Sequence, residues 1–102
     1  MPVIHSNDAD FRAILTSQDK IVVKFYADWC GSCKILAPKF EAMSNEADKA
    51  DITFVKINAE ENPEIRKAVG VSNLPFFVYF ENKAIKASGS MSKEDAIRAL
   101  IQ

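Results

Sequence analysis

The run Ile21–Tyr26 is the feature that most constrains the fold of this chain. It is apolar at every position except Lys24 and is rich in β-branched residues. Such a run is typical of a strand that is covered on both faces of a sheet. We therefore expect a buried central strand here, with other elements packed against each of its two faces.

Strand-like and helical segments alternate along the rest of the chain. Strands are expected at residues 2–5, 21–26, 52–57, 76–81 and 84–88. Helices are expected after the cap candidates Ser6, Asn7 and Asp8, from Gly31 to about Lys49 with a kink at Pro38, from Asn62-Pro63 to Gly70, and from Ser92.

The alternation of strands and helices implies a parallel portion of sheet with right-handed crossovers. The last two strands are separated only by Asn82-Lys83, which predicts an antiparallel hairpin. The expected fold class is therefore α/β, with a mixed central sheet of about five strands flanked by four helices. We expect one domain that occupies residues 1–102.

The expected helices are amphipathic, because their apolar residues recur at spacings of three and four. The residues expected to face the sheet are Phe11, Ile14 and Leu15 in the first helix, Leu36, Phe40, Met43 and Ala47 in the long helix, and Ile97, Leu100 and Ile101 in the last.

Charge and hydropathy exclude several classes of partner. The chain has 13 Lys plus Arg and 14 Asp plus Glu, without a long basic run. This balance argues against nucleic acid or anionic lipid as the main partner. No apolar stretch approaches the roughly 18 residues of a membrane span, and the N-terminus resembles neither a secretory nor an organellar leader. We expect a monomer that stays in the cytoplasm.

The cysteine pair is the clearest chemical signal. Cys30 and Cys33 are the only cysteines, so within one chain they can pair only with each other. A disulfide that closes so short a ring stabilises a fold by only roughly 2 kcal/mol, against about 4.7 for a ring of a hundred residues. On the first turn of a helix, however, two residues three apart can form and break a disulfide with little backbone movement. The spacing therefore favours a redox switch over a structural link.

A metal site is the main alternative for such a pair. With two cysteines and His5 as the only histidine, one chain cannot supply the four ligands of a structural zinc site from these residue types. We expect neither a metal nor a bound cofactor other than the redox-active disulfide itself.

The motif around the cysteines resembles that of the thioredoxin family. The resemblance begins with Phe25-Tyr26-Ala27-Asp28, continues through Trp29-Cys30-Gly31-Ser32-Cys33-Lys34 and Ala37-Pro38, and extends through Lys56-Ile57-Asn58, Asn62-Pro63, Val71-Ser72-Asn73-Leu74-Pro75 and Gly89. It covers essentially the whole chain in the order and length of the family. It implies the thioredoxin fold and a dithiol–disulfide oxidoreductase that reduces disulfides in protein substrates and is recharged by a thioredoxin-reductase-like electron donor.

The resemblance also assigns roles to individual residues. Cys30 would be the attacking thiolate, exposed at a helix N-terminus, and Cys33 the less accessible resolving thiol. The Leu74-Pro75 bond would be cis and would lie beside the sulfurs. The substrate-binding surface would consist of a partly exposed Trp29 together with Gly31, Ser32, Ala59, Val71, Leu74, Pro75 and Gly89.

Two positions depart from the family pattern. Ser32 stands where a proline is usual, which adds a backbone donor near the sulfurs and favours the thiolate, and hence a weaker reductant. Lys24 stands where the family has a buried aspartate that serves the resolving thiol as a base. An ammonium there would lower a thiol pKa and offer no base unless burial deprotonates it.

Lys24 has several possible environments. Lys56 matches a half-buried lysine of the family, so two ammonium groups would face the same region. Either one lysine reaches water, one loses its proton, or Asp28 or Glu60 becomes a partner. A solvated lysine without function and a functional substitution are both compatible with the sequence.

Three functions remain open at this point. The chain is a general disulfide reductase, a less reducing relative with few partners, or a binding module in which the cysteines are dispensable. Replacing both cysteines separates the third hypothesis from the others, and a redox potential separates the first two.

Overall fold

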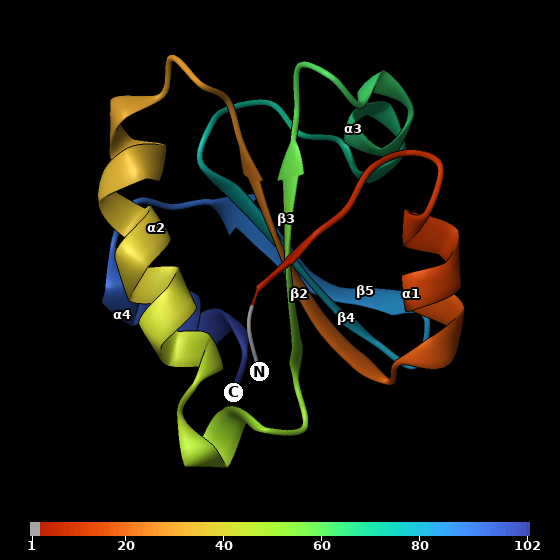
Figure 1. Cartoon of the computed structure of the whole chain (residues 1–102), viewed down its shortest axis with the longest axis vertical. Coiled ribbons are helices and arrows are strands. Elements are labelled where there is room, and N and C mark those ends of the chain that lie inside the picture. The colour runs from red at the N-terminus through yellow and green to blue at the C-terminus, as the bar shows by residue number, and fades with distance from the viewer. Residues whose placement is uncertain (1–2) are drawn as a thin grey trace.

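The computed structural model describes residues 3–102, which form a five-stranded mixed sheet between two layers of helices (Figure 1). The strand order is β1-β3-β2-β4-β5. The strands are β1 (Ile4–His5), β2 (Lys20–Tyr26), β3 (Thr53–Asn58), β4 (Phe76–Glu81) and β5 (Ala84–Ser90). β3 runs parallel to β1 and β2, whereas β4 runs antiparallel to β2 and β5. The predicted α/β class and the mixed sheet are confirmed.

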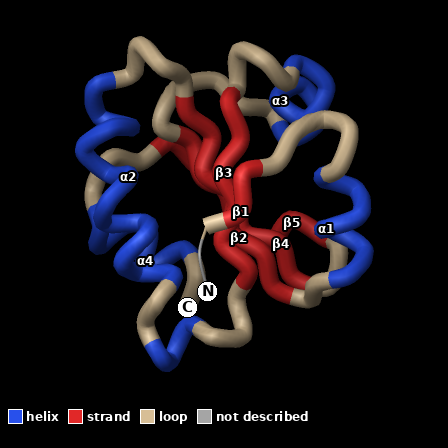
Figure 2. Tube along the Cα trace, in the orientation of Figure 1, coloured by secondary structure: helices blue, strands red, loops and turns tan. Residues whose placement is uncertain are grey.

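The helices cover the two faces of the sheet in pairs. α1 (Phe11–Ser17) and α3 (Pro63–Val69) lie on one side, and α2 (Gly31–Ser44) and α4 (Glu94–Leu100) lie on the other (Figure 2). The expected central strand is β2, and its residues alternate between the two layers. Ile21, Val23 and Phe25 join the hydrophobic cluster under α1 and α3. Val22 joins the cluster under α2 and α4, and Lys24 shares this face of β2 because side chains alternate along a strand.

The long helix is shorter than its apolar spacing suggests. It ends at Ser44, and a separate 3-10 turn, η1, follows at Ala47–Lys49. Asn45 ends the helix because its backbone leaves the helical region and its side-chain amide donates to the carbonyl of Glu41 at 3.2 Å. The expectation that Ala47 is buried is therefore wrong, since it is exposed on η1. Leu36, Phe40 and Met43 are buried as expected.

Smaller differences concern the ends of elements. The strand expected at residues 2–5 is found at Ile4–His5, and Pro2 lies outside the described residues. The last helix begins at Glu94, after Lys93 at its N-cap, and not at Ser92. β5 extends to Ser90, two residues beyond the expected end.

The caps of the first and third helices involve each other's segments. The side chain of Asn7 accepts from the backbone N–H of Asp10. Asp8 was a candidate cap for α1, but it does not cap this helix. Its carboxylate instead accepts from the backbone N–H groups of Ile65 and Glu64, at 2.8 and 3.2 Å, in the first turn of α3. In return, Asn62 accepts from the N–H of Asp8 at 2.8 Å.

The hairpin between β4 and β5 forms at the predicted turn. Asn82 and Lys83 have φ angles of +53° and +70°, the left-handed conformation that a two-residue hairpin turn of this type requires. None of the helices found within residues 3–102 is long and apolar enough to cross a membrane.

Candidate active site

The two cysteines lie where the central strand meets the longest helix. β2 ends at Tyr26, and a short turn leads to Cys30, which is the N-cap residue of α2. The backbone N–H of Cys30 donates to the carbonyl of Ala27 at 3.1 Å and closes this turn. Cys33 lies in the first turn of α2, and the two residues form a disulfide with their Cα atoms 5.3 Å apart. The end of a buried strand and the start of a helix thus position both cysteines.

The surroundings of Cys30 favour a negative charge on its sulfur. The backbone N–H of Cys33 donates to Sγ of Cys30 at 3.2 Å. The first turn of a helix also has backbone N–H groups without partners within the helix, and the positive end of its dipole lies here. Because these groups stabilise a thiolate more than a thiol, Cys30 is the better candidate for the nucleophile.

Cys30 is more buried than expected, whereas the burial of Cys33 agrees with the expectation. Cys30 is 5% exposed and Cys33 is 2% exposed in the disulfide form, so the expectation of an exposed Cys30 is wrong. The order of accessibility is as expected. Ala27 and both cysteines form a small apolar cluster, against which the half-buried side chains of Tyr26 and Leu74 pack. Their burial follows from this apolar cover.

The Leu74-Pro75 bond is cis, as predicted. Leu74 packs on the cysteine cluster, so the segment before β4 lies beside the sulfurs. The carbonyl of Pro75 accepts from the backbone N–H of Met91 and from the hydroxyl of Ser90, each at 3.2 Å. These two bonds hold the segment against the end of β5.

The residues expected to bind substrate differ widely in exposure. Trp29 is 67% exposed, Gly31 and Ser32 are also exposed, and Leu74 and Gly89 are half-buried. Val71 and Pro75 are buried, and Ala59 is 1% exposed within a core cluster, so its side chain offers almost no surface to a partner.

Sequence reasoning missed one apolar residue at this surface. Ile35 follows Lys34 on α2 and is 66% exposed. The signal was present in the helical spacing, because Ile35 lies off the buried face that Leu36 and Phe40 define. The two exposed apolar side chains, Trp29 and Ile35, thus flank the cysteine pair in the sequence.

A cavity of about 180 Å³ lies behind Cys33. It is lined by Lys24, Tyr26, Ala27, Asp28, Cys33, Lys34, Ala37 and Lys56. Lys24 and Lys56 are directly paired neighbours on β2 and β3, which explains why both reach this space. The cavity thus brings together the two lysines and the second cysteine of the predicted site.

Lys24 is a buried residue of the central strand. It is 4% exposed, so a solvated surface lysine is excluded. Its Nζ lies 5.6 Å from the ring centroid of Phe40 and 5.8 Å from that of Tyr26. Neither Asp28 nor Glu60 appears in the ion pairs found within residues 3–102.

Burial changes the proton affinity of Lys24. The pKa falls from 10.5 to about 8, mainly because burial disfavours the charged form and secondly because of repulsion by Lys56. Attraction to Glu41 partly opposes this fall. Of the environments considered from the sequence, the structure favours the one in which a lysine loses its proton readily.

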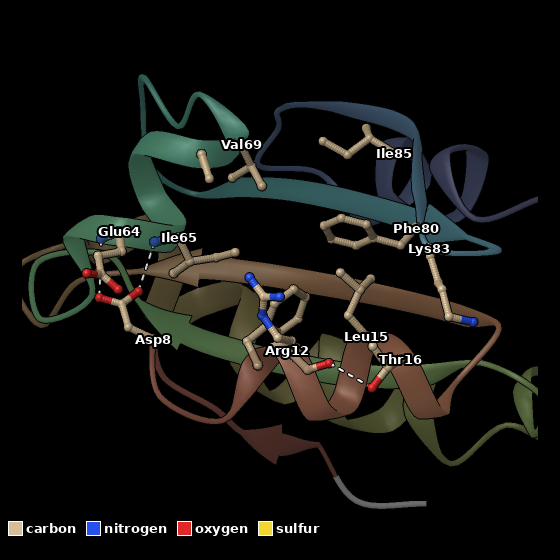
Figure 3. Close-up of a pocket in the computed structure, with 12 residues that line it drawn as sticks. Asp8, Arg12, Leu15, Thr16, Glu64, Ile65, Val69, Phe80, Lys83 and Ile85 are labelled. Atoms are coloured by element: carbon tan, nitrogen blue, oxygen red, sulfur yellow. Dashed lines mark hydrogen bonds between the residues drawn. The ribbon is translucent and has the colours of Figure 1, made fainter.

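A larger cavity lies elsewhere, between α1, α3 and the β4–β5 hairpin (Figure 3). Its volume is about 570 Å³, and its apolar lining includes Phe11, Leu15, Val69, Phe80 and Ile85. None of the predicted site residues lines it. Within residues 3–102, no group of three or more His, Cys, Asp or Glu side chains is arranged to hold a metal ion.

Comparisons with known proteins agree with this geometry. The thioredoxin family model matches residues 2–102. Thioredoxin-T of Drosophila melanogaster is 38% identical over 80 residues, which are 78% of this chain and 50% of that relative. The chain thus spans half the length of this relative. The thioredoxin of Mycoplasmoides gallisepticum is 39% identical over 77 residues, which are 76% of this chain and 75% of the relative.

A solved structure gives the same fold. The short form of thioredoxin f from spinach chloroplast superposes with a TM-score of 0.91 at 28% identity, over 99% of this chain and 91% of that one. A disulfide at the start of α2, a cis-proline beside it and a match over almost the whole chain all agree. The chain therefore belongs to the thioredoxin family and is a dithiol–disulfide oxidoreductase.

Proposed function

We propose that this protein reduces disulfides in other proteins, with Cys30 as the attacking thiolate and Cys33 as the resolving thiol. The observation that carries the proposal is the asymmetry of the pair. Cys30 lies at the N-cap of α2 and accepts the N–H of Cys33, whereas Cys33 lies deeper and borders the cavity. The residue with the better-stabilised thiolate attacks first, and the residue behind it completes the exchange.

The reaction transfers two electrons through a mixed disulfide. The Cys30 thiolate attacks one sulfur of the substrate disulfide, which forms the mixed disulfide and releases the first substrate thiolate. The Cys33 thiolate then attacks Sγ of Cys30, which forms the Cys30–Cys33 disulfide and releases the second thiolate. The substrate disulfide is reduced, and the protein dithiol is oxidised.

The partners follow from this cycle. Because each turnover leaves the protein oxidised, a dithiol donor such as a thioredoxin-reductase-like enzyme must reduce it again. A monomer in a reducing compartment such as the cytoplasm is the setting that fits this cycle. For substrate docking, Trp29 and Ile35, which flank the cysteine pair in the sequence, offer exposed apolar surface.

Reduction of insulin disulfides in the presence of a dithiol tests the proposal. The wild-type protein should accelerate reduction, and the Cys30→Ser, Cys33→Ser double variant should not. Absence of any acceleration by the folded wild-type protein would favour the binding-module hypothesis instead. Thermal unfolding of both proteins shows whether the double variant is folded.

A less reducing relative is the second candidate, because the cavity holds a buried amine beside the resolving cysteine. A redox potential measured against glutathione, compared with that of the Ser32→Pro variant, tests it. A more negative potential for Ser32→Pro would support a contribution from Ser32. Equal potentials would leave the general reductase as the better description.

A further inference from the structure

The cavity that Cys33 lines also holds a buried basic group, the amine of Lys24. Lys24 is 4% exposed, and none of the ion pairs found within residues 3–102 includes it. The ring faces of Phe40 and Tyr26 lie near its Nζ, with centroids at 5.6 and 5.8 Å. A buried ammonium group without a counter-charge is costly, so a group of this kind needs a reason to be here.

Charged groups from β3, from α2 and from the turn after β2 lie around Lys24. β3 contributes Lys56, α2 contributes Lys34 and Glu41, and the turn after β2 contributes Asp28. β4 contributes no charge at this point, because Phe77 pairs with Lys24 there. Besides burial, two charges change the pKa of the Lys24 amine, which are the repelling charge of Lys56 and the attracting charge of Glu41. The carboxylate of Asp28 and the ammonium of Lys34 also line the cavity.

The space between Lys24 and Cys33 suits proton transfer. Both residues line the same cavity of about 180 Å³, which is large compared with the roughly 30 Å³ that one water occupies in the liquid. A water can therefore bridge the amine and the thiol where the two side chains do not meet directly. Cys33 is 2% exposed, so bulk solvent has poor access to its proton.

We propose that the Lys24 amine accepts the proton of the Cys33 thiol when Cys33 attacks the mixed disulfide. This inference rests on the proposed function, because it concerns the second step of that reaction. The proton passes from Sγ of Cys33 to Nζ of Lys24, either directly or through a water. The Cys33 thiolate then attacks Sγ of Cys30, and the leaving thiolate takes up a proton from solvent or from the Lys24 ammonium.

The lowered pKa of Lys24 suits this amine to accept a proton from a thiol. The pKa of Lys24 is lowered to about 8, and an ordinary cysteine thiol has a pKa of about 8.5. Proton transfer between groups of similar pKa is nearly balanced, which is the condition for efficient general base catalysis. At pH 7 about a tenth of the Lys24 side chains are neutral, and this fraction grows to about half at pH 8.

The reaction of the reduced protein with DTNB separates the two steps. Attack by Cys30 releases a first coloured thiolate at a rate that depends on protein concentration. Attack by Cys33 on the mixed disulfide releases a second one at a rate that does not. Stopped-flow absorbance between pH 6.5 and 9.5 therefore gives the rate of each step separately.

Four variants and the wild type test the role of Lys24. In Lys24→Met the second phase should be about a hundredfold slower at pH 8, the lower end of what a positioned base contributes. The matched control is Lys86→Met, which removes a lysine that also lies over a ring, at 5.8 Å from Tyr79, but away from the cavity. Its second phase should match that of the wild type.

The pH profile gives a readout that a purely structural role would not change. In the wild type the second phase should rise with a midpoint near pH 8. Lys56→Met removes a repulsion and should shift the midpoint to higher pH, whereas Glu41→Gln removes an attraction and should shift it to lower pH. Shifts in these opposite directions support the proposal when Lys24→Met lacks the midpoint near pH 8, because a Cys33 thiol that titrated by itself would keep that midpoint.

Specific outcomes overturn the inference. If the folded Lys24→Met variant has the wild-type second phase, or if Lys56→Met and Glu41→Gln leave the midpoint in place, Lys24 is not the proton acceptor. A wild-type protein that reduces neither insulin nor DTNB would instead contradict the proposed function. Circular dichroism of each variant identifies those that fail to fold, and Lys24→Leu replaces Lys24→Met if the latter is among them.

Discussion

The backbone N–H of Cys33 points at Sγ of Cys30, at a distance of 3.2 Å. One cysteine of the pair therefore helps to stabilise the charge of the other. The relationship is not reciprocal, because Cys30 is the N-cap residue and its own N–H is bonded to the carbonyl of Ala27. This asymmetry leads to the first prediction.

Cys33→Ser should accumulate a covalent mixed disulfide with a protein substrate, and Cys30→Ser should not. In the first variant the attacking thiolate remains but no resolving thiol is present to release the substrate. Non-reducing electrophoresis and intact mass measure the adduct. Accumulation by Cys30→Ser alone would exchange the two roles.

The buried Lys24 should make stability depend on pH in the alkaline range. Because its pKa is lowered from 10.5 to about 8 on folding, the unfolded chain binds more protons at this site between these values. Stability therefore rises with pH across this window, and the penalty is fully present below about pH 8. The size of the effect is about 3 kcal/mol at most.

Urea denaturation of the wild type and of Lys24→Met at several pH values measures this effect. The variant should be the more stable protein at pH 7, and its advantage should shrink towards pH 10. Lys86→Met serves as the control, because it removes a more exposed lysine from β5. A constant difference between Lys24→Met and the wild type would show that Lys24 titrates normally.

Asp8→Ala should destabilise the fold by about 1–2 kcal/mol, as expected for the loss of a helix cap. The Asp8 carboxylate accepts two backbone N–H groups of α3, from Glu64 and Ile65. Asp19→Ala provides the control, since this carboxylate is exposed and lies in the turn before β2. Urea denaturation measures both variants, and an equal loss in both would argue against the cap.

The turn between β4 and β5 provides a prediction about the backbone. Lys83 has a φ of +70°, a conformation that glycine adopts without strain and a β-branched residue adopts poorly. Lys83→Gly should stabilise the protein by roughly 0.5 kcal/mol, and Lys83→Val should destabilise it by about 1 kcal/mol or more. Thermal unfolding checks the order, which is the reverse of what strand propensity alone predicts.

Much of the fold could be predicted from local patterns. The run Ile21–Tyr26 indicated a strand buried on both faces, and β2 is that strand. The Asn82-Lys83 turn indicated the hairpin, because only the left-handed conformation fits so short a connection. These features depend on residues that are close in sequence.

The features that could not be predicted depend on distant residues. Asp8 looked like a cap for the helix that follows it, but its partner is Ile65, on a helix that only the folded sheet brings near. Ala47 continued the spacing of Leu36, Phe40 and Met43, but the chain leaves the helix at Asn45. The spacing of apolar residues alone does not show where a helix ends.

In the candidate site, too, some features could be predicted from the sequence and others could not. The disulfide and the cis bond before Pro75 were expected from the motifs. The neighbouring Lys56 was also expected, but which of the three environments Lys24 occupies was not, since this depends on how β3 and α2 pack Lys56 and Phe40 against it. The exposure of Ile35 was a further feature that the motif did not indicate.

The central position of β2 affects the order in which the site is completed during synthesis. β2 is made early, but both of its neighbours come later in the chain, and Ile21 pairs with Thr53 on one side and with Phe80 on the other. While the nascent chain lacks β4, one edge of β2 stays open, and Leu74 is not yet packed on the cysteines. Cys30 and Cys33 are therefore translated before the segments that bury them. On the ribosome, the two cysteines are less protected from an oxidant than in the finished fold.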